Sequence, residues 1–227
     1  MRTRNDAGAI WSEAGVPEFY EQHRLTTSDV YPAEWFFLEK ILAEGMSILD
    51  IGCAVGGFAS IFAEHLKDFT YTGLDISPEM IRRAKERNRQ HEFHVIEEGD
   101  LSPVKGRRFD LVLSLGILHL SPGWRELIAD AWQRVGKFLL LDLRETNGPT
   151  IEDAARSYFK MDIYTNREGE SRLPYNLINS AEAWKTVTDR CSGFTKLRHY
   201  GYVGPVSRSA VTPVGEVMMN TYCIEKS

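Results

Sequence analysis

The sequence is poor in cysteine, and its three cysteines, Cys53, Cys191 and Cys223, are far apart. An odd number without metal-ligand spacing argues against a disulfide framework and against a cysteine-based metal site, and it suits a reducing compartment. We therefore expect a cytoplasmic protein that holds no metal.

The chain also lacks an excess of positive charge. Lys and Arg number 27 against 32 Asp and Glu, which gives a formal net charge of −5. Binding to nucleic acid relies on clustered Lys and Arg that displace counterions, so we expect no nucleic-acid partner. Basic residues do gather between Ile81 and Gln90, where their helical spacing indicates a solvated helix face.

Long apolar runs are missing as well. Runs such as Phe138 to Leu141 are far shorter than the roughly 20 residues that span a bilayer. The N-terminal stretch carries charges but no apolar segment of the kind found in secretory signals. These features predict a protein without a membrane partner or a targeting leader.

What the 227 residues do contain is a regular alternation of short apolar runs and helical segments. Strand-like runs occur at 47–52, 70–76, 92–100, 109–118 and 137–143, and helical ones at 58–66, 77–89 and 123–135. Apolar strands that alternate with helices are typical of a parallel sheet covered on both faces. Two further strand-like runs, at 196–204 and 214–226, have only a turn-rich connection and predict an antiparallel pair at one edge. The expected fold is α/β, doubly wound and Rossmann-like, with a mainly parallel seven-stranded sheet, an antiparallel last strand and N-terminal helices.

The same pattern suggests how the chain is organised. Residues 1–45 are expected to form an N-terminal helical lid, and residues 46–227 the main domain. A segment of mixed character at about 145–179 is interpreted as an insertion on the substrate side.

Three glycines, Gly52, Gly56 and Gly57, follow the first strand where a helix is about to begin. In an open parallel sheet, ligands bind beyond the carboxyl ends of the strands, and glycine lets a ligand approach the main chain closely. A dinucleotide site expects the pattern G-x-G-x-x-G, but Ala54 occupies its second position, where a pyrophosphate needs the closest approach. The motif alone is also compatible with a turn that holds nothing.

Acidic residues follow the first three predicted strands, and they favour a ligand site. Asp50 precedes the glycines, Asp75 ends the second strand and Asp100 ends the third. An acid at the position of Asp75 can accept both hydroxyls of a ribose. Each acid alone could be a helix cap or a loop residue, but three at successive strand ends point to a nucleoside.

These motifs together resemble those of the class I S-adenosylmethionine-dependent methyltransferases, over roughly Ile48 to the C-terminus. The stretches LDIGCAVGG, GLDISPEMI, EGDL and FDLVLSLGILHL are similar to four successive family motifs. The resemblance implies S-adenosylmethionine as cofactor, and it implies the following cofactor-binding residues: Asp50, Gly52, Cys53, Ala54, Gly56, Asp75, Ile76, Asp100, Leu101, Ser114, Leu115 and Gly116. Ala54 departs from the family glycine, which a cofactor without a pyrophosphate tolerates better than a dinucleotide does.

His119, a few residues after the fourth strand, is the candidate catalytic base. A base is needed when the acceptor arrives protonated, and an unperturbed histidine titrates near neutrality. The alternative is a histidine that orients a loop or contacts the cofactor.

Four residues are candidates for binding the substrate: Tyr20, Arg144, Tyr175 and Arg208. Arg144 could hold an anionic acceptor, or it could form a surface salt bridge with Asp142 or Glu145. We expect methylation of a polar small molecule, such as a sugar or a natural-product intermediate, on oxygen rather than nitrogen, by a monomer or homodimer. The alternatives are an NAD(P)-dependent oxidoreductase and a catalytically inactive cofactor-binding partner.

Overall fold

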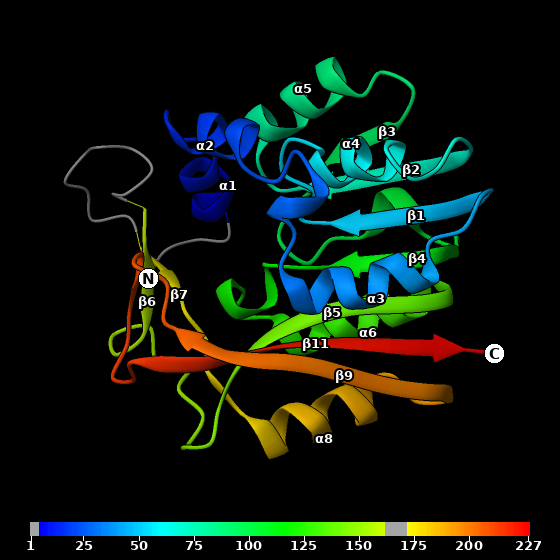
Figure 1. The fold of residues 1–227 in the computed structure, drawn as a ribbon. Coiled ribbons are helices and arrows are strands. Elements are labelled where there is room, and N and C mark those ends of the chain that lie inside the picture. Colours follow the sequence, from blue (N-terminus) through cyan, green and yellow to red (C-terminus); the bar gives the residue numbers. More distant parts are fainter. Residues whose placement is uncertain (1–4, 162–171) are drawn as a thin grey trace.

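The computed structural model of the protein describes residues 5–161 and 172–227. Its main sheet has the strand order β3-β2-β1-β4-β5-β11-β9 (Figure 1). The short strand β8 pairs with β5. The strands are β1 (Met46–Ile51), β2 (Phe69–Asp75), β3 (Glu92–Val95), β4 (Phe109–Ser114), β5 (Val135–Thr146), β8 (Ile178–Asn179), β9 (Phe194–Pro205) and β11 (Glu216–Lys226). The strands β1 to β5 pair in parallel, whereas β11 runs antiparallel to both β5 and β9. The predicted fold class is confirmed.

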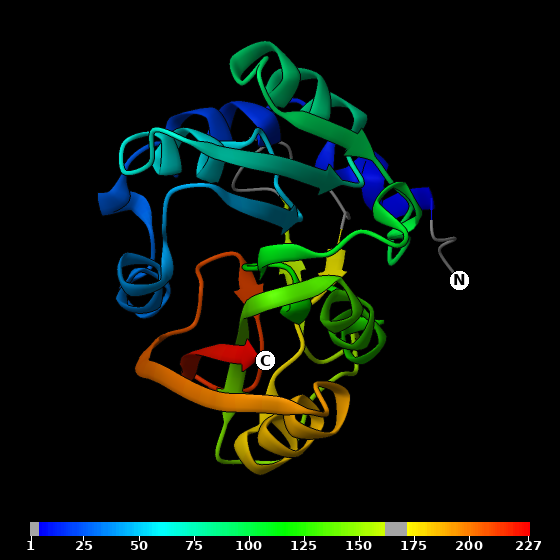
Figure 2. The same ribbon diagram turned by 90° about the vertical axis from the view of Figure 1, so that its right-hand side faces the viewer.

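Helices cover both faces of this sheet (Figure 2). On one face, α3 (Pro32–Ile41), α4 (Gly57–Ala63) and α5 (Pro78–Arg87) pack into one apolar core. On the other face, α6 (Trp124–Arg134) and α8 (Ser180–Arg190) pack into a second core. Within the described ranges, the connections also contain the short 3₁₀ helices η1 (Thr27–Asp29), η2 (Ser102–Val104) and η3 (Leu118–Leu120).

A third core lies at the edge where the parallel strands end, on the side of the molecule toward which β1 and β4 point in Figure 1. Here α1 (Asn5–Trp11) and α2 (Val16–Gln22) lie near a small sheet of order β10-β6-β7. Its strands are β6 (Tyr158–Lys160), β7 (Arg172–Pro174) and β10 (Ala210–Val211). We call α1, α2 and this small sheet the cap. Its core includes Ile10, Val16, Phe159 and Leu173.

The residues of the expected N-terminal lid therefore lie in two places. The helices α1 and α2 belong to the cap, whereas α3 packs on the sheet through Phe37 and Leu38. The expected insertion at 145–179 contributes β6, β7 and β8, and its centre, 162–171, lies outside the described residues. The lid and the domain boundaries stay predictions.

Two predicted strands are too long. The run 109–118 forms β4, which ends at Ser114, and η3 begins at Leu118. β3 ends at Val95, because Gly99 has a positive φ of +78° and the Asp100 amide donates to the Glu97 carbonyl at 2.9 Å. The stretch that carries Asp100 is thus a turn beyond the strand. Within residues 5–161 and 172–227, no helix combines the length and the apolar character that crossing a membrane requires.

Candidate functional site

The glycine turn after β1 has the sharp geometry that its sequence suggests. The φ angles of Gly52, Ala54 and Gly56 are +82°, +46° and +75°, in the left-handed region where side chains are disfavoured. A Cβ atom added to Gly52 would lie 2.5 Å from Cγ2 of Ile117, so this position has no room for a side chain. The turn therefore presents bare main chain to the space beyond the strand.

Asp75, at the end of β2, is tied to this turn. Its Oδ2 accepts a hydrogen bond from the Ala54 amide at 2.9 Å, and its Oδ1 accepts one from the Ser77 amide at 2.8 Å. Burial raises the pKa of Asp75 to about 6, although the amides of Ser77 and Ala54 oppose the shift. A carboxylate accepts about four hydrogen bonds, so Asp75 keeps acceptor capacity for a ligand.

A cavity of about 310 Å³ opens above the turn, and we call it the first cavity. Its walls come from the glycine turn, the ends of β2 and β4, the loop after β3, and the cap. They include Gly52, Cys53, Ala54, Asp75, Ile76, Ile96, Glu98, Gly99, Leu115, Gly116, Ile10, Trp11, Tyr20, Leu173 and Pro174. The structure thus brings eight of the predicted site residues to one cavity: Tyr20, Gly52, Cys53, Ala54, Asp75, Ile76, Leu115 and Gly116. Cys53 is a buried thiol whose pKa burial raises well above its usual value, as expected of a space-filling residue.

Two of the predicted cofactor residues are buried below the turn instead of lining the cavity. Asp50 is 1% exposed and accepts a hydrogen bond from the Tyr71 hydroxyl, and burial raises its pKa to about 7. Gly56 faces Asn88 and Phe93, whose side chains would lie 2.8 and 3.2 Å from an added Cβ. Both residues support the shape of the turn.

Three other predicted cofactor residues also lie outside the cavity walls. Asp100 is exposed and accepts hydrogen bonds from the amide and the hydroxyl of Ser102, both at 2.8 Å. Leu101 packs in the core beneath α6, and Ser114 is buried. In the loop after β3, the cavity is lined instead by Ile96, Glu98 and Gly99, which the sequence reasoning passed over.

Arg24 is a further residue that the sequence reasoning missed. It lies between α2 and η1 with a φ of +65°, and it lines both the first cavity and a second one of about 430 Å³. One of its guanidinium nitrogens is 3.3 Å from the position of a Cβ on Gly116. Within the described residues, this guanidinium makes no hydrogen bond or ion pair, and it lies 5.4 Å from the ring centre of Tyr31. Arg24 is therefore a cation available to a ligand.

The second cavity lies beside the first, and the two share Tyr20, His23 and Arg24. Its other walls come from the segment that includes η1 and from the loop before β10. They are Phe19, Asp29, Tyr31, Ser207, Arg208 and Ser209. The predicted substrate residue Arg208 is thus in the second cavity, next to the first.

Arg24 belongs to a group of five titratable side chains whose charges influence one another. We call this group the charged cluster, and it consists of Arg24, Glu34, His119, Asp142 and Arg144. Asp142 and Arg144 form a buried ion pair, and Asp142 Oδ1 also accepts a hydrogen bond from the Gly116 amide at 2.6 Å. Arg144 thus forms a salt bridge with Asp142, one of the two partners named as the alternative to an anionic acceptor, although this bridge is buried and not on the surface. Burial disfavours the ionised carboxyl of Asp142, but the positive charge of Arg144 and the hydrogen bond from the Gly116 amide outweigh this and lower its pKa.

His119, in η3, is buried in this cluster. Burial, together with the positive charges of Arg144 and Arg24, lowers its pKa to about 3, so its imidazole is neutral over the physiological range. The ring packs edge-on against Tyr175 with their centres 5.4 Å apart, and Tyr175 also interacts with Arg144. The structure therefore brings together His119, Arg144 and Tyr175, all predicted from the sequence.

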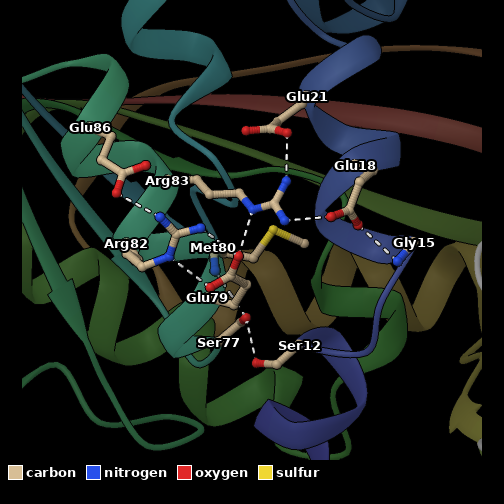
Figure 3. A network of polar contacts seen from close by, with 10 residues as sticks. All are labelled: Ser12, Gly15, Glu18, Glu21, Ser77, Glu79, Met80, Arg82, Arg83 and Glu86. Atoms are coloured by element: carbon tan, nitrogen blue, oxygen red, sulfur yellow. Dashed lines mark hydrogen bonds and ion pairs between the residues drawn. The ribbon is translucent and has the colours of Figure 1, made fainter.

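The cap is held above the site by a network that centres on Arg83 of α5 (Figure 3). Its guanidinium contacts Glu18 and Glu21 of α2, the latter at 2.5 Å, and Glu79 of its own helix at 2.7 Å. The hydroxyls of Ser12 and Ser77 are 2.8 Å apart and join the end of α1 to the start of α5. The basic stretch from Ile81 to Gln90 is thus not merely a solvated face, because one of its arginines anchors the cap.

Comparisons with known proteins agree with this site. A sequence model of a family described as "Methyltransferase domain" matches residues 49–138. A phthiotriol/phenolphthiotriol dimycocerosates methyltransferase of Mycobacterium tuberculosis is 24% identical over 189 residues, which are 80% of this chain and 70% of the relative. A fatty-acid O-methyltransferase of Mycolicibacterium smegmatis is 27% identical over 154 residues, 65% of this chain and 55% of that protein.

Two solved structures share the fold. The N-terminal domain of EvdMO1 with SAH bound has a TM-score of 0.61 at 16% identity, and the match covers 85% of this chain and 79% of that one. Magnesium protoporphyrin IX methyltransferase from Synechocystis PCC 6803 with bound SAM has a TM-score of 0.59 at 14% identity, covering 100% and 99%.

The family match spans the glycine turn, Asp75 and the end of β4, the three elements that form the floor of the first cavity. The relatives named above are methyltransferases, so neither an oxidoreductase nor an inactive partner has support. These findings support an S-adenosylmethionine-dependent methyltransferase, and they are consistent with the class I family that the motifs of this chain resemble.

Proposed function

We propose that this methyltransferase methylates an oxygen atom of an amphipathic small molecule that binds under the cap. The observation that carries the proposal is the course of the first cavity. It runs from Asp75 and the glycine turn to apolar cap residues such as Ile10, Trp11 and Leu173. Ligand cavities with mostly apolar walls and a few polar groups suit molecules with an apolar body and one reactive polar end.

The residues at the floor of this cavity fit the cofactor. Asp75 keeps acceptor capacity beyond the main-chain amides that it already holds, and a carboxylate at this place can accept from the hydroxyls of a ribose. Gly52 and Gly116 have no side chains and adopt positive φ angles, so the methionine part can approach the main chain. The guanidinium of Arg24 lies next to Gly116 and makes no hydrogen bond or ion pair with any described residue, so it is suited to the methionine carboxylate. Ile96, Glu98 and Gly99 would flank the adenine in place of Asp100.

When bound, the cofactor supplies a methyl group that a positively charged sulfur has already activated. The protein's part is to align the acceptor oxygen and to exclude water, and alignment alone can contribute several kcal/mol, up to roughly 10 kcal/mol, to catalysis. The cap core beside the cavity, with Ile10, Val16 and Tyr175 buried, supports a water-poor site.

The acceptor class rests on the cavity walls and on the relatives together. The relatives act, by their names, on phthiotriol or phenolphthiotriol dimycocerosates and on fatty acids. The apolar walls suit such molecules better than the sugar that the sequence suggested, so we favour an amphipathic acceptor. Arg144, Tyr175 and Arg208 remain candidates for binding its polar end, as predicted from the sequence.

The proposal is tested by incubating the purified protein with S-adenosylmethionine and three acceptors, namely dodecanol, dodecanoate and glucose, followed by mass spectrometry of the products. Methylation of dodecanol or dodecanoate, and none of glucose, is the expected result. Methylation of glucose alone would refute the amphipathic class while leaving the family assignment intact.

A further inference from the structure

Of the buried carboxylates in the described residues, Glu34 is the one without a hydrogen-bond donor. Glu34, Asp50, Asp142 and Glu145 are each at most 2% exposed. Tyr71 donates to Asp50, Gly116 and Arg144 donate to Asp142, and Tyr222 and Asn220 donate to Glu145. Both carboxylate oxygens of Glu34 lack a partner among the residues that the structure describes. Native proteins rarely leave a buried acceptor unpaired, so a group of this kind suggests a ligand or a catalytic role.

Glu34 lines neither cavity itself, but it lies close to residues that do. It lies in the first turn of α3, where its amide donates to the carbonyl of Tyr31 at 3.0 Å. Tyr31 lines the second cavity, and its ring centre is 5.4 Å from the Cζ atom of Arg24 and 5.7 Å from that of Arg144. Arg24 in turn lines both cavities and lies against Gly116. Glu34 is thus one helical turn from a side chain that lies near both arginines at the end of the sheet.

The other members of the charged cluster are poorly suited to accept a proton. His119 is neutral and flanked by two arginines, which oppose its protonation. Asp142 already holds Arg144 and the Gly116 amide. A hydroxyl acceptor still has to lose its proton during the transfer.

From this geometry we infer that Glu34 accepts the proton of a hydroxyl acceptor; the inference rests on the proposed function. In the transfer, the acceptor oxygen forms a bond to the methyl carbon, and the carbon–sulfur bond breaks with its electron pair staying on sulfur. The hydroxyl proton passes to a Glu34 oxygen, which later releases it to water. No oxidant or further reactant is needed.

The electrostatics of Glu34 agree with this role. Burial raises its pKa to about 7, and Asp142 adds to the shift, whereas Arg24 and Arg144 oppose it. Tyr202 of β9 also interacts with it. A base whose pKa is near the working pH combines availability with proton affinity. Because the base must be ionised, the rate is expected to be full above about pH 7 and to fall about tenfold per pH unit below it.

The kinetic test compares wild type, Glu34→Gln and a matched control, Glu39→Gln, which changes an exposed acid of the same helix. With dodecanol as acceptor, Glu34→Gln should lower kcat by about 100-fold and remove the acidic limb of the pH profile. With dodecanoate, which arrives ionised, all three proteins should have the same rate within about threefold, because a carboxylate needs no base. The inference would be overturned if Glu34→Gln lost the same factor in kcat with both acceptors, or if its pH profile kept the acidic limb. It would also be overturned if wild type methylated dodecanoate but not dodecanol.

Two measurements do not depend on turnover. Infrared titration of the protein with bound S-adenosylhomocysteine should show a carboxylic-acid band that is missing from Glu34→Gln and that titrates near pH 7. A midpoint near the ordinary value of about 4.3 would overturn the inference. The melting temperature of Glu34→Gln should be no lower than that of wild type, and a large drop would mean a structural role instead. If wild type methylates neither acceptor, the proposed acceptor class fails, and the titration still decides about Glu34.

Discussion

The two halves of the site are built differently. On the side of β1 and β2, the polar groups are already satisfied: Asp75 holds two main-chain amides, and Asp50 holds the Tyr71 hydroxyl. On the side of β4, β5 and α3, several buried polar atoms have no hydrogen-bond partner among the residues that the structure describes. They include both oxygens of Glu34, Nδ1 of His119 and Oγ of Ser114. In the site that we propose, the cofactor side is thus preorganised by its own backbone, whereas the acceptor side keeps unsatisfied groups that a substrate can engage.

This difference makes the cofactor side sensitive to backbone shape. Gly52→Ala should weaken S-adenosylmethionine binding by at least about 100-fold, because the left-handed φ costs roughly 1–2 kcal/mol and the new Cβ would clash with Ile117. The measurement is isothermal titration calorimetry.

Gly45→Ala is the matched control. Gly45 has a φ of +78°, similar to that of Gly52, but a Cβ there would meet nothing within 4 Å. This variant should lose stability and keep its cofactor affinity within about twofold. Equal affinity losses in both variants would mean that general strain, and not the shape of the turn, sets cofactor binding.

Arg24 lies between the two halves of the site, and a substitution there tests whether its guanidinium binds the cofactor. Arg24→Met should weaken binding of S-adenosylmethionine by about tenfold, because a charge-assisted contact to the methionine carboxylate is lost. Methylthioadenosine has no such carboxylate, so its affinity should not change. If both ligands lose affinity alike, Arg24 shapes the cavity and does not bind the carboxylate.

The cap contact is expected to have the smallest effect. Arg83→Met removes contacts with three acids, two of them on α2, and should lower the free energy of unfolding by about 1 kcal/mol and speed amide exchange in α2. Arg82→Met is the control, because Arg82 is paired only with Glu79 and Glu86 of its own helix among the described residues. Identical exchange in the two variants would show that Arg83 does not hold the cap.

The sequence was most informative where a function is encoded by neighbouring residues. The glycine turn and Asp75 could be predicted because a strand, its turn and the next strand end follow each other closely in the chain. Asp100 was chosen over Glu98 and Gly99 since the run 92–100 reads as one strand, and only the turn at Gly99 shows which side chains reach the cavity.

The acceptor side could not be predicted in the same way. Arg24 and Glu34 look like ordinary surface residues in the sequence, and they meet Asp142 and Arg144 only in the folded chain. The sequence predicted that His119 lies near the site, but it could not predict that two arginines lie close enough to lower the pKa of His119. Likewise, β6 pairs with β10 about fifty residues later, which no local pattern indicates.

The central claim is that the Asp75 carboxylate binds the ribose of S-adenosylmethionine, and its most direct test is the cofactor affinity of wild type and Asp75→Asn as a function of pH. The raised pKa of about 6 means that the free protein takes up a proton at Asp75 below that pH, whereas binding requires the ionised form. Wild-type affinity should therefore be constant above about pH 7 and fall toward tenfold per pH unit below about pH 6. Asp75→Asn should bind at least about tenfold more weakly at pH values near 8 and show no change around pH 6. Equal affinity of the two proteins, or the same pH dependence in both, would contradict the account.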